Sequence, residues 1–167
     1  MYYADASRVC LEPCVPYGWQ FPDEDVFMPS AKGKGLNCFG LLTRTNKLMF
    51  STTTQNINST FVFEYLDRLS FMLEKPTVIV LDNASVHTAK IIQQQRNVWE
   101  ERGLILFYLP PYSPQLNLIE ILWKMLKYYW LKPEDYAEEQ LLFYKTTQAL
   151  AAVGNTLNIN FSDLALV

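Results

Sequence analysis

The chain has 167 residues, half of them hydrophobic, with 14 Lys and Arg against 17 Asp and Glu and a formal net charge of −3. This composition predicts one globular domain, residues 1–167, and excludes a disordered chain. No apolar run is long enough to span a membrane, so no membrane contact is expected. Three cysteines, Cys10, Cys14 and Cys38, favour a reducing, cytoplasmic location over a secreted disulfide scaffold.

The first third of the chain predicts a strand, a long loop and a hairpin. Residues 1–9 contain two adjacent tyrosines, which favour extended structure. Residues 11–35 are rich in Pro, Gly and acidic residues and predict a loop, with a short strand at residues 17–21. Two extended stretches, 35–43 and 47–54, then predict an antiparallel hairpin.

The middle of the chain predicts strands that alternate with helices. Asn58 or Ser59 is predicted to cap a helix, and Pro76 excludes its continuation. Thr77–Leu81 is β-branched and apolar, as in a strand buried on both faces. A polar helix at 88–102 follows, and then a second buried strand, Leu104–Tyr108. A strand, helix and strand in this order predict a parallel pair.

A proline-rich loop precedes the last predicted helices, 118–131 and 134–153. The predicted fold is therefore α/β: a mixed β-sheet, antiparallel in its early strands and parallel in its later ones, with helices on its faces. Aromatic residues of the last helices are interpreted as core or as a self-association surface, with core favoured; they are Tyr128, Tyr129, Tyr136, Phe143 and Tyr144.

Three acidic residues stand in apolar surroundings. Asp5 lies inside the first strand, Asp82 ends the most hydrophobic strand, and Glu120 lies early in a helix. Each has a structural interpretation, since Asp82 can cap a turn and Glu120 can interact with the helix dipole. Together, three oxygen donors without a Cys or His cluster suit Mg²⁺ or Mn²⁺. Two such ions can flank an in-line phosphoryl displacement.

Lys124 and Lys127 follow Glu120 at helical spacing, so all three share one stripe of the helix. The lysines can contact phosphates of DNA there, or act only as ordinary surface partners of Glu120.

Two segments carry a resemblance to a known family. Residues 80–87 (VLDNASVH) and 109–123 (LPPYSPQLNLIEILW) resemble the second and third signature blocks of DDE transposases, in the bacterial insertion-sequence group allied to the mariner superfamily. The resemblance implies a ribonuclease-H-like fold and metal-dependent DNA hydrolysis and strand transfer. It implies that Asp5, Asp82 and Glu120 are the catalytic residues and the ligands of two Mg²⁺ or Mn²⁺ ions.

The same resemblance implies helper roles for Asn83, His87 and Asn117. His87, the single histidine, has three interpretations: it orients the attacking water or a ligand, contacts DNA, or satisfies a backbone group. Ala6 and Leu118 depart from the family pattern, since relatives often have an acid and a proline at these positions. Neither departure removes an expected metal ligand.

Double-stranded DNA, as transposon ends and target DNA, is the implied partner. Asp5 leaves no room before it for the helix-turn-helix region of relatives, so this region is expected to be absent. The mildly acidic charge agrees with that expectation, because phosphate contacts normally come from Lys and Arg. A separately encoded DNA-binding subunit and a homodimer are candidate partners. Two alternatives stay open: a simple ribonuclease-H-like nuclease, and an inactive or split-frame transposase remnant.

Overall fold

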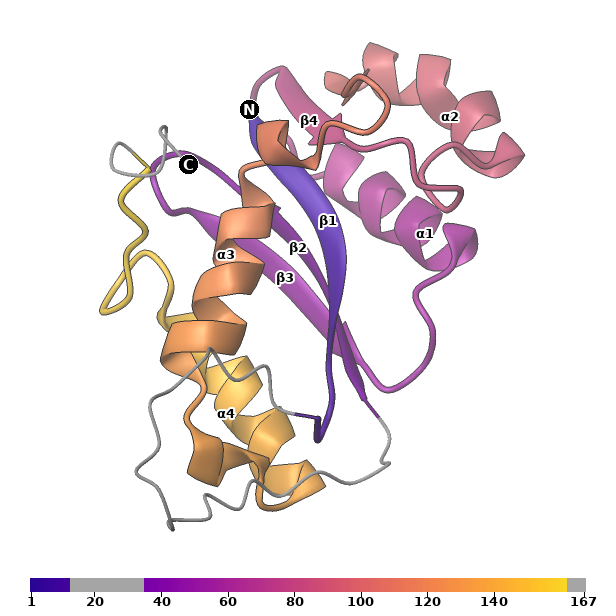
Figure 1. Cartoon of the computed structure of the whole chain (residues 1–167). Helices are drawn as coiled ribbons and strands as arrows, with labels where there is room; N and C mark the ends of the chain where they lie inside the picture. Colours follow the sequence, from indigo (N-terminus) through magenta and orange to yellow (C-terminus); the bar gives the residue numbers. More distant parts are fainter. Residues whose placement is uncertain (13–34, 162–167) are drawn as a thin grey trace, which may run out of the picture.

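The computed structural model describes residues 1–12 and 35–161 (Figure 1). The strand expected at 17–21, most of the expected loop and Cys14 lie outside the described residues. Cys10 and Cys38 are both free thiols, and Cys38 is fully buried. Within the described ranges no helix is long and apolar enough to cross a membrane.

The sheet has five strands in the order β3-β2-β1-β4-β5. Their bounds are β1 Tyr2–Val9, β2 Leu36–Leu42, β3 Leu48–Thr53, β4 Thr77–Leu81 and β5 Leu104–Tyr108. The first three strands pair antiparallel, and β4 is parallel to both β1 and β5. This arrangement confirms the predicted mixed sheet.

Helices cover both faces of the sheet (Figure 1). On one face lie α1, Ser59–Ser70, and α2, Lys90–Glu101; on the other lie α3, Ile119–Met125, and α4, Glu139–Ala152. The Asn58 side chain accepts a hydrogen bond from the Phe61 N–H and so caps α1, as predicted. Asp67 of α1 joins α2 by accepting hydrogen bonds from Trp99 Nε1 at 3.0 Å and Arg102 Nη1 at 2.8 Å.

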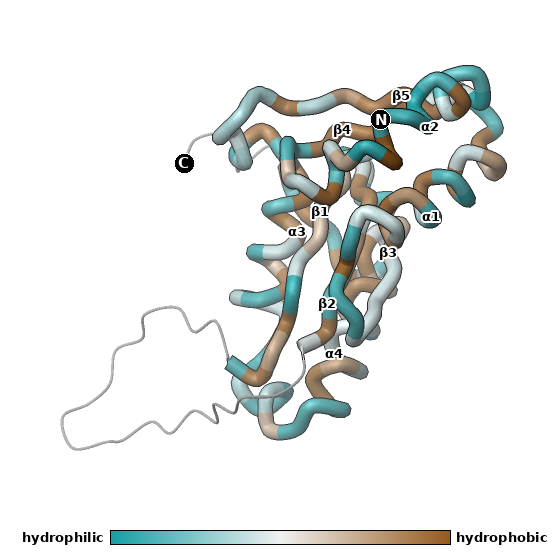
Figure 2. The backbone as a smooth tube through the Cα atoms, turned by 90° about the vertical axis from the view of Figure 1, so that its right-hand side faces the viewer, coloured by the Kyte–Doolittle hydropathy of each residue, from teal (hydrophilic) through white to brown (hydrophobic). Residues whose placement is uncertain are grey.

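Two hydrophobic clusters follow from these layers. One fills the space between the sheet and α1 and α2, with Ile79, Leu81 and Trp99 among its fully buried members. The other lies beneath α3 and α4 and includes Ile119 and Leu142. Figure 2 shows α3 alternating between hydrophobic and hydrophilic stretches, as expected for a helix with one face on a sheet.

The last third departs from the predicted pair of helices. The first continues beyond α3 as a π-helical segment, η2, Leu126–Trp130. The second was expected from residue 134, but Pro133–Tyr136 forms a separate 3₁₀ turn, η3, and α4 begins at Glu139. The Asp135 side chain accepts a hydrogen bond from the Lys132 N–H and stabilises the separate turn.

The expectation that the aromatic residues of these helices are core is wrong for three of them. Tyr128, Tyr129 and Tyr144 are exposed, whereas Tyr136 is buried and Phe143 packs against the core.

Candidate active site

Asp5 of β1 and Asp82, the residue after β4, lie near each other because β1 and β4 are adjacent, parallel strands. Tyr2 pairs with Ile79 and Tyr3 with Val80, and each aspartate lies two residues beyond the second pair. Asp82 also follows the last residue of β4, at the carboxyl end where ligands of such sheets collect. The register thus brings together two acids that are 77 positions apart in the sequence.

The segment from β5 to α3 brings Glu120 to the same edge. Asn83 Nδ2 donates a hydrogen bond to the Leu109 carbonyl at 2.5 Å, which holds the start of the loop after β5. A short 3₁₀ turn, η1, Pro114–Leu116, then leads to buried Asn117, whose Nδ2 donates to the Ala4 carbonyl at 3.1 Å. The N–H of Glu120 donates to the Asn117 carbonyl at 3.0 Å. Asn117 therefore links the beginning of α3 to the strand that carries Asp5.

The pKa values of the three acids show that they interact. Burial raises the pKa of Asp5 from 3.8 to about 6, with further increases from the charges of Glu120 and Asp82. Burial also raises the pKa of Glu120, and the charge of Asp82 adds to it. Like charges raise a carboxyl pKa only where they are near each other in a partly buried site. Asp5 is therefore within electrostatic range of both other acids, and Glu120 is within range of Asp82.

Asp82 differs from the other two acids in the direction of its pKa shift, because His87 donates a hydrogen bond to it. Its Oδ1 accepts from the Ala84 N–H at 3.0 Å and from His87 Nδ1 at 2.6 Å. The bond from His87 lowers the pKa of Asp82 more than burial raises it. Asp82 is thus held ionised at the edge where Asp5 and Glu120 resist ionisation.

His87 contacts Asp82 from inside the core. The residue is buried, its ring centroid lies 6.4 Å from that of Phe39, and its carbonyl accepts from the Tyr108 hydroxyl at 2.8 Å. Its Nε2 has no hydrogen-bond partner among the described residues. Because an ionised carboxylate only accepts hydrogen bonds, the proton belongs on Nδ1. Of the three interpretations, this geometry favours His87 as a residue that orients Asp82.

The three acids offer the oxygen ligands that a divalent cation prefers, but their side chains are too far apart to hold one ion. Within residues 1–12 and 35–161, no three His, Cys, Asp or Glu side chains lie close enough to hold one ion. Asp82 Oδ1 is engaged by His87 and Ala84, and Asp5 Oδ2 accepts a hydrogen bond from Trp123 Nε1 at 3.0 Å. The chemistry of the three carboxylates nevertheless fits Mg²⁺ or Mn²⁺, which prefers oxygen ligands and would relieve the repulsion that Asp5 and Glu120 experience.

The two lysines of the predicted stripe differ in their surroundings. Lys127 is half-buried, and its charge partly offsets the increase in pKa that burial causes at Glu120 and at the Cys38 thiol. Lys124 is exposed. Lys127 is therefore the lysine that faces the acids.

Sequence reasoning missed Trp123 and Gly40 as parts of this site. Trp123 lies one helical turn after Glu120, and that spacing was a signal available in the sequence. Its bond to Asp5 spans 118 positions and has no local signature.

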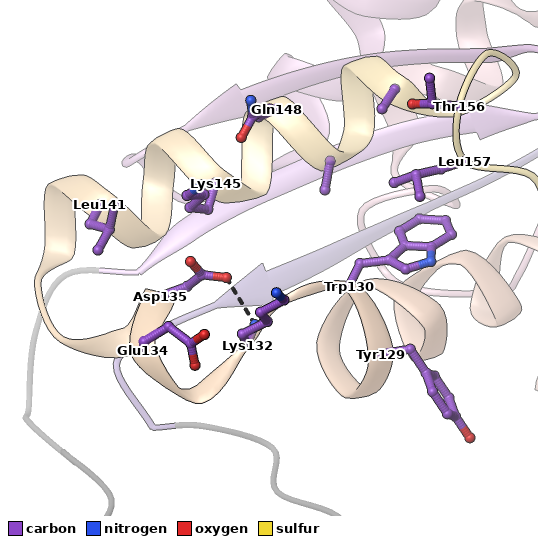
Figure 3. Close-up of a pocket in the computed structure, with 12 residues that line it drawn as sticks. Tyr129, Trp130, Lys132, Glu134, Asp135, Leu141, Lys145, Gln148, Thr156 and Leu157 are labelled. Atoms are coloured by element: carbon purple, nitrogen blue, oxygen red, sulfur yellow. Dashed lines mark hydrogen bonds between the residues drawn. The ribbon is translucent and has the colours of Figure 1, made fainter.

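A hollow of about 370 Å³ adjoins Asp82 and is lined by Asn83 and by the loop after β5. Tyr112 stands on its rim, fully exposed and in the left-handed backbone region, with φ of 56°. Such strain, of order 1–3 kcal/mol, is concentrated at functional sites. A separate hollow of about 760 Å³ lies between η2, η3 and α4 (Figure 3), and its lining includes none of the three acids.

The mixed sheet with helices on both faces is a ribonuclease-H-like fold, as in transposase and integrase cores. Residues 1–142 match the DDE superfamily endonuclease family, and the chain belongs to that family. A comparison with curated proteins finds no sequence match.

Solved structures support the same fold. The Mos1 transposase paired-end complex with left transposon end is 15% identical with a TM-score of 0.62, over 90% of this chain and 47% of that chain. The Mos1 mariner paired-end complex with Mn is 14% identical with the same TM-score, over 90% and 48%. The simian T-cell lymphotropic virus intasome with PP2A regulatory subunit B56 gamma is 15% identical with a TM-score of 0.60, over 93% and 56%. This chain thus spans about half the length of those chains.

Proposed function

We propose that this chain is the catalytic domain of a DDE transposase of the bacterial insertion-sequence group allied to mariner. It hydrolyses DNA phosphodiester bonds and transfers the freed strand to target DNA. Asp5, Asp82 and Glu120 are the catalytic acids and hold two Mg²⁺ or Mn²⁺ ions. The observation that supports the proposal is electrostatic: beyond the effect of burial, the charges of Glu120 and Asp82 raise the pKa of Asp5, and the charge of Asp82 raises that of Glu120.

Bound divalent ions would supply activation of the attacking oxygen and stabilisation of the leaving one. The protein's own residues prepare for this chemistry. His87 orients Asp82 and favours its ionised form, and Asn83 holds the loop that leads toward Glu120. Asn117 ties the start of α3, which carries Glu120, to β1, which carries Asp5. Lys124 and Lys127 contact phosphates of the DNA.

The partners follow from the class of protein. Double-stranded DNA, as transposon ends and target, is the substrate. One Mos1 structure is a paired-end complex with a left transposon end, and another is a strand transfer complex. This chain covers about half of the length of those chains. A separately encoded DNA-binding subunit is the proposed partner for recognition of specific ends, and a homodimer is a second candidate assembly.

Two assays test the proposal. The first measures nicking of supercoiled plasmid DNA with Mn²⁺ or EDTA. Wild type should nick only with Mn²⁺, and Asp82→Asn and Glu120→Gln should each lose about 10²-fold or more of the rate. Glu101→Gln, an exposed acid of α2, serves as the matched control and should leave the rate unchanged. Nicking by Asp82→Asn at the wild-type rate contradicts the proposal.

The second assay separates a transposase from a nuclease. It supplies duplexes with a pre-cut 3′-hydroxyl end, taken from the DNA that flanks the coding sequence, together with plasmid target DNA. Joined products identify strand transfer. Nicking of plasmid without joined products at any flanking end identifies a nuclease.

A further inference from the structure

The helix that carries Glu120 also holds the side chain of Asp5. Trp123 lies one turn after Glu120, is 3% exposed, and donates from Nε1 to Asp5 Oδ2 at 3.0 Å. The backbone beside Asp5 is already held by the sheet and by the bond from Asn117 to the Ala4 carbonyl. The Asp5 carboxylate also accepts from the Ala6 backbone N–H of its own strand, and the bond from Trp123 is the one that holds it from α3.

The neighbouring strand leaves room for the indole ring. Gly40 of β2 is the cross-strand partner of Asp5. A Cβ atom at this position would lie 3.1 Å from Trp123 Cη2 and 3.0 Å from Ile119 Cδ1. Both contacts are tighter than ordinary packing, so any side chain here would push the ring. The absence of a side chain at Gly40 therefore leaves the space in which the Trp123 ring reaches Asp5.

On the basis of the proposed function, we propose that Trp123 is a positioning residue that presents Asp5 to a divalent cation. A carboxylate fixed through one oxygen loses less rotational freedom when an ion binds. Groups that hydrogen-bond to metal ligands typically change metal affinity or activity by 10–100-fold when removed. The sites of Asp5 and Glu120 are thereby coupled, because one helix turn supplies Glu120 and orients Asp5.

The test is Trp123→Phe, which removes the N–H donor and keeps an aromatic ring. Trp99→Phe is the matched control, because Trp99 is also buried and donates Nε1 to an aspartate, Asp67, at 3.0 Å, on the other face of the sheet. Mn²⁺ binding is measured by titration with electron paramagnetic resonance. Trp123→Phe should bind Mn²⁺ about tenfold more weakly, and Trp99→Phe should bind as wild type does.

A purely structural role predicts a different result. If Trp123 only packs, both substitutions lower the melting temperature and neither changes Mn²⁺ affinity. If Trp123 positions Asp5, the Mn²⁺ concentration for half-maximal nicking rises, while the rate at saturating Mn²⁺ falls much less. Wild-type or tighter Mn²⁺ binding by folded Trp123→Phe overturns the inference.

Two further variants keep the test decisive if Trp123→Phe does not fold. Incorporating 3-benzothienylalanine at position 123 keeps the bicyclic shape and removes the donor. Gly40→Ala displaces the ring without touching the Asp5 carboxylate, and it should weaken Mn²⁺ binding in the same way. Failure of the proposed function looks different, since wild type would then bind no Mn²⁺ or bind it equally well after Asp82→Asn.

Discussion

At the residue scale, two aspartates at one sheet edge are held in opposite states by their neighbours. Asp5 is buried beside like charges, and its pKa rises to about 6. Asp82 accepts two hydrogen bonds through one oxygen, and its pKa falls. The protein thus maintains one carboxylate that is ionised throughout the neutral range and one whose ionisation is opposed by the fold. A divalent cation would favour ionisation of both.

The raised pKa of Asp5 predicts how stability depends on pH. The folded state holds this proton more tightly than the unfolded chain, so stability falls as pH rises from about 4 and the full cost applies above about 6. The shift corresponds to at most about 3 kcal/mol. Asn does not titrate and can still accept from Trp123. Asp5→Asn should therefore be more stable than wild type at about pH 8, and equal to it at about pH 4.

Urea denaturation in EDTA at both pH values checks this expectation, with Glu101→Gln as the control acid. An Asp5→Asn variant that is no more stable than wild type at the higher pH would show that burial does not oppose the charge of Asp5.

The bond from His87 predicts different outcomes for two amide substitutions. An Asn side chain can place its amide nitrogen near the position of Nδ1, the atom that contacts Asp82, whereas Gln reaches the position of Nε2, which has no partner among the described residues. His87→Asn should therefore keep more Mn²⁺-dependent nicking than His87→Gln, by about tenfold. Plasmid nicking at equal folded concentration measures the difference. Equal losses in the two variants would rule out orientation of Asp82 through Nδ1.

At the element scale, α3 and η2 form one unit that carries Glu120, Trp123 and Lys127. The sequence was sufficient to predict that a helix begins after the proline-rich loop and carries an acid on its first turn. The bounds of the strands Thr77–Leu81 and Leu104–Tyr108 were predicted to the residue from their continuous apolar runs. The prediction that Leu104–Tyr108 is buried is wrong for one of its faces, because β5 is an edge strand and Ile105 and Phe107 are exposed.

Other features could not be predicted because they depend on tertiary contacts. The Trp123 bond to Asp5 exists only once α3 packs on β1, and Gly40 matters only because that ring lies over it. The turn at Pro133–Tyr136 was predicted as the start of α4, because Pro133 fits the first position of a helix as well as that of a 3₁₀ turn.

The different surroundings of Lys127 and Lys124 predict that both lysines bind DNA but that only Lys127 affects the ionisation of Glu120. Removing either lysine should weaken DNA binding for all sequences and reduce the salt slope by about one. Only Lys127→Ala should also shift the acidic limb of the pH–rate profile of nicking to higher pH, because the Lys127 charge lowers the pKa of Glu120. DNA binding at several salt concentrations and nicking across the pH range measure the two effects. Identical pH–rate profiles for Lys127→Ala and Lys124→Ala would contradict the assignment of this pKa effect to Lys127.

At the scale of the whole molecule, a net charge of −3 is unusual for a protein that must approach DNA. Two divalent ions in the acidic site would change the charge to +1. The change would also be concentrated where the scissile phosphate must lie, so occupancy of the site would convert a repelling edge into one that accepts a phosphate backbone.

This charge reversal predicts that Mg²⁺ strengthens DNA binding, opposite to its usual effect as a competing counterion. Fluorescence anisotropy with a labelled duplex should show about tenfold tighter binding in Mg²⁺ than in EDTA at the same ionic strength. The double variant Asp82→Asn, Glu120→Gln should bind more tightly than wild type in EDTA, since two repelling charges are gone, and Mg²⁺ should not improve it. A wild-type affinity that falls with Mg²⁺, as it does for binders that rely on Lys and Arg alone, would mean that the ions do not bridge this domain to DNA.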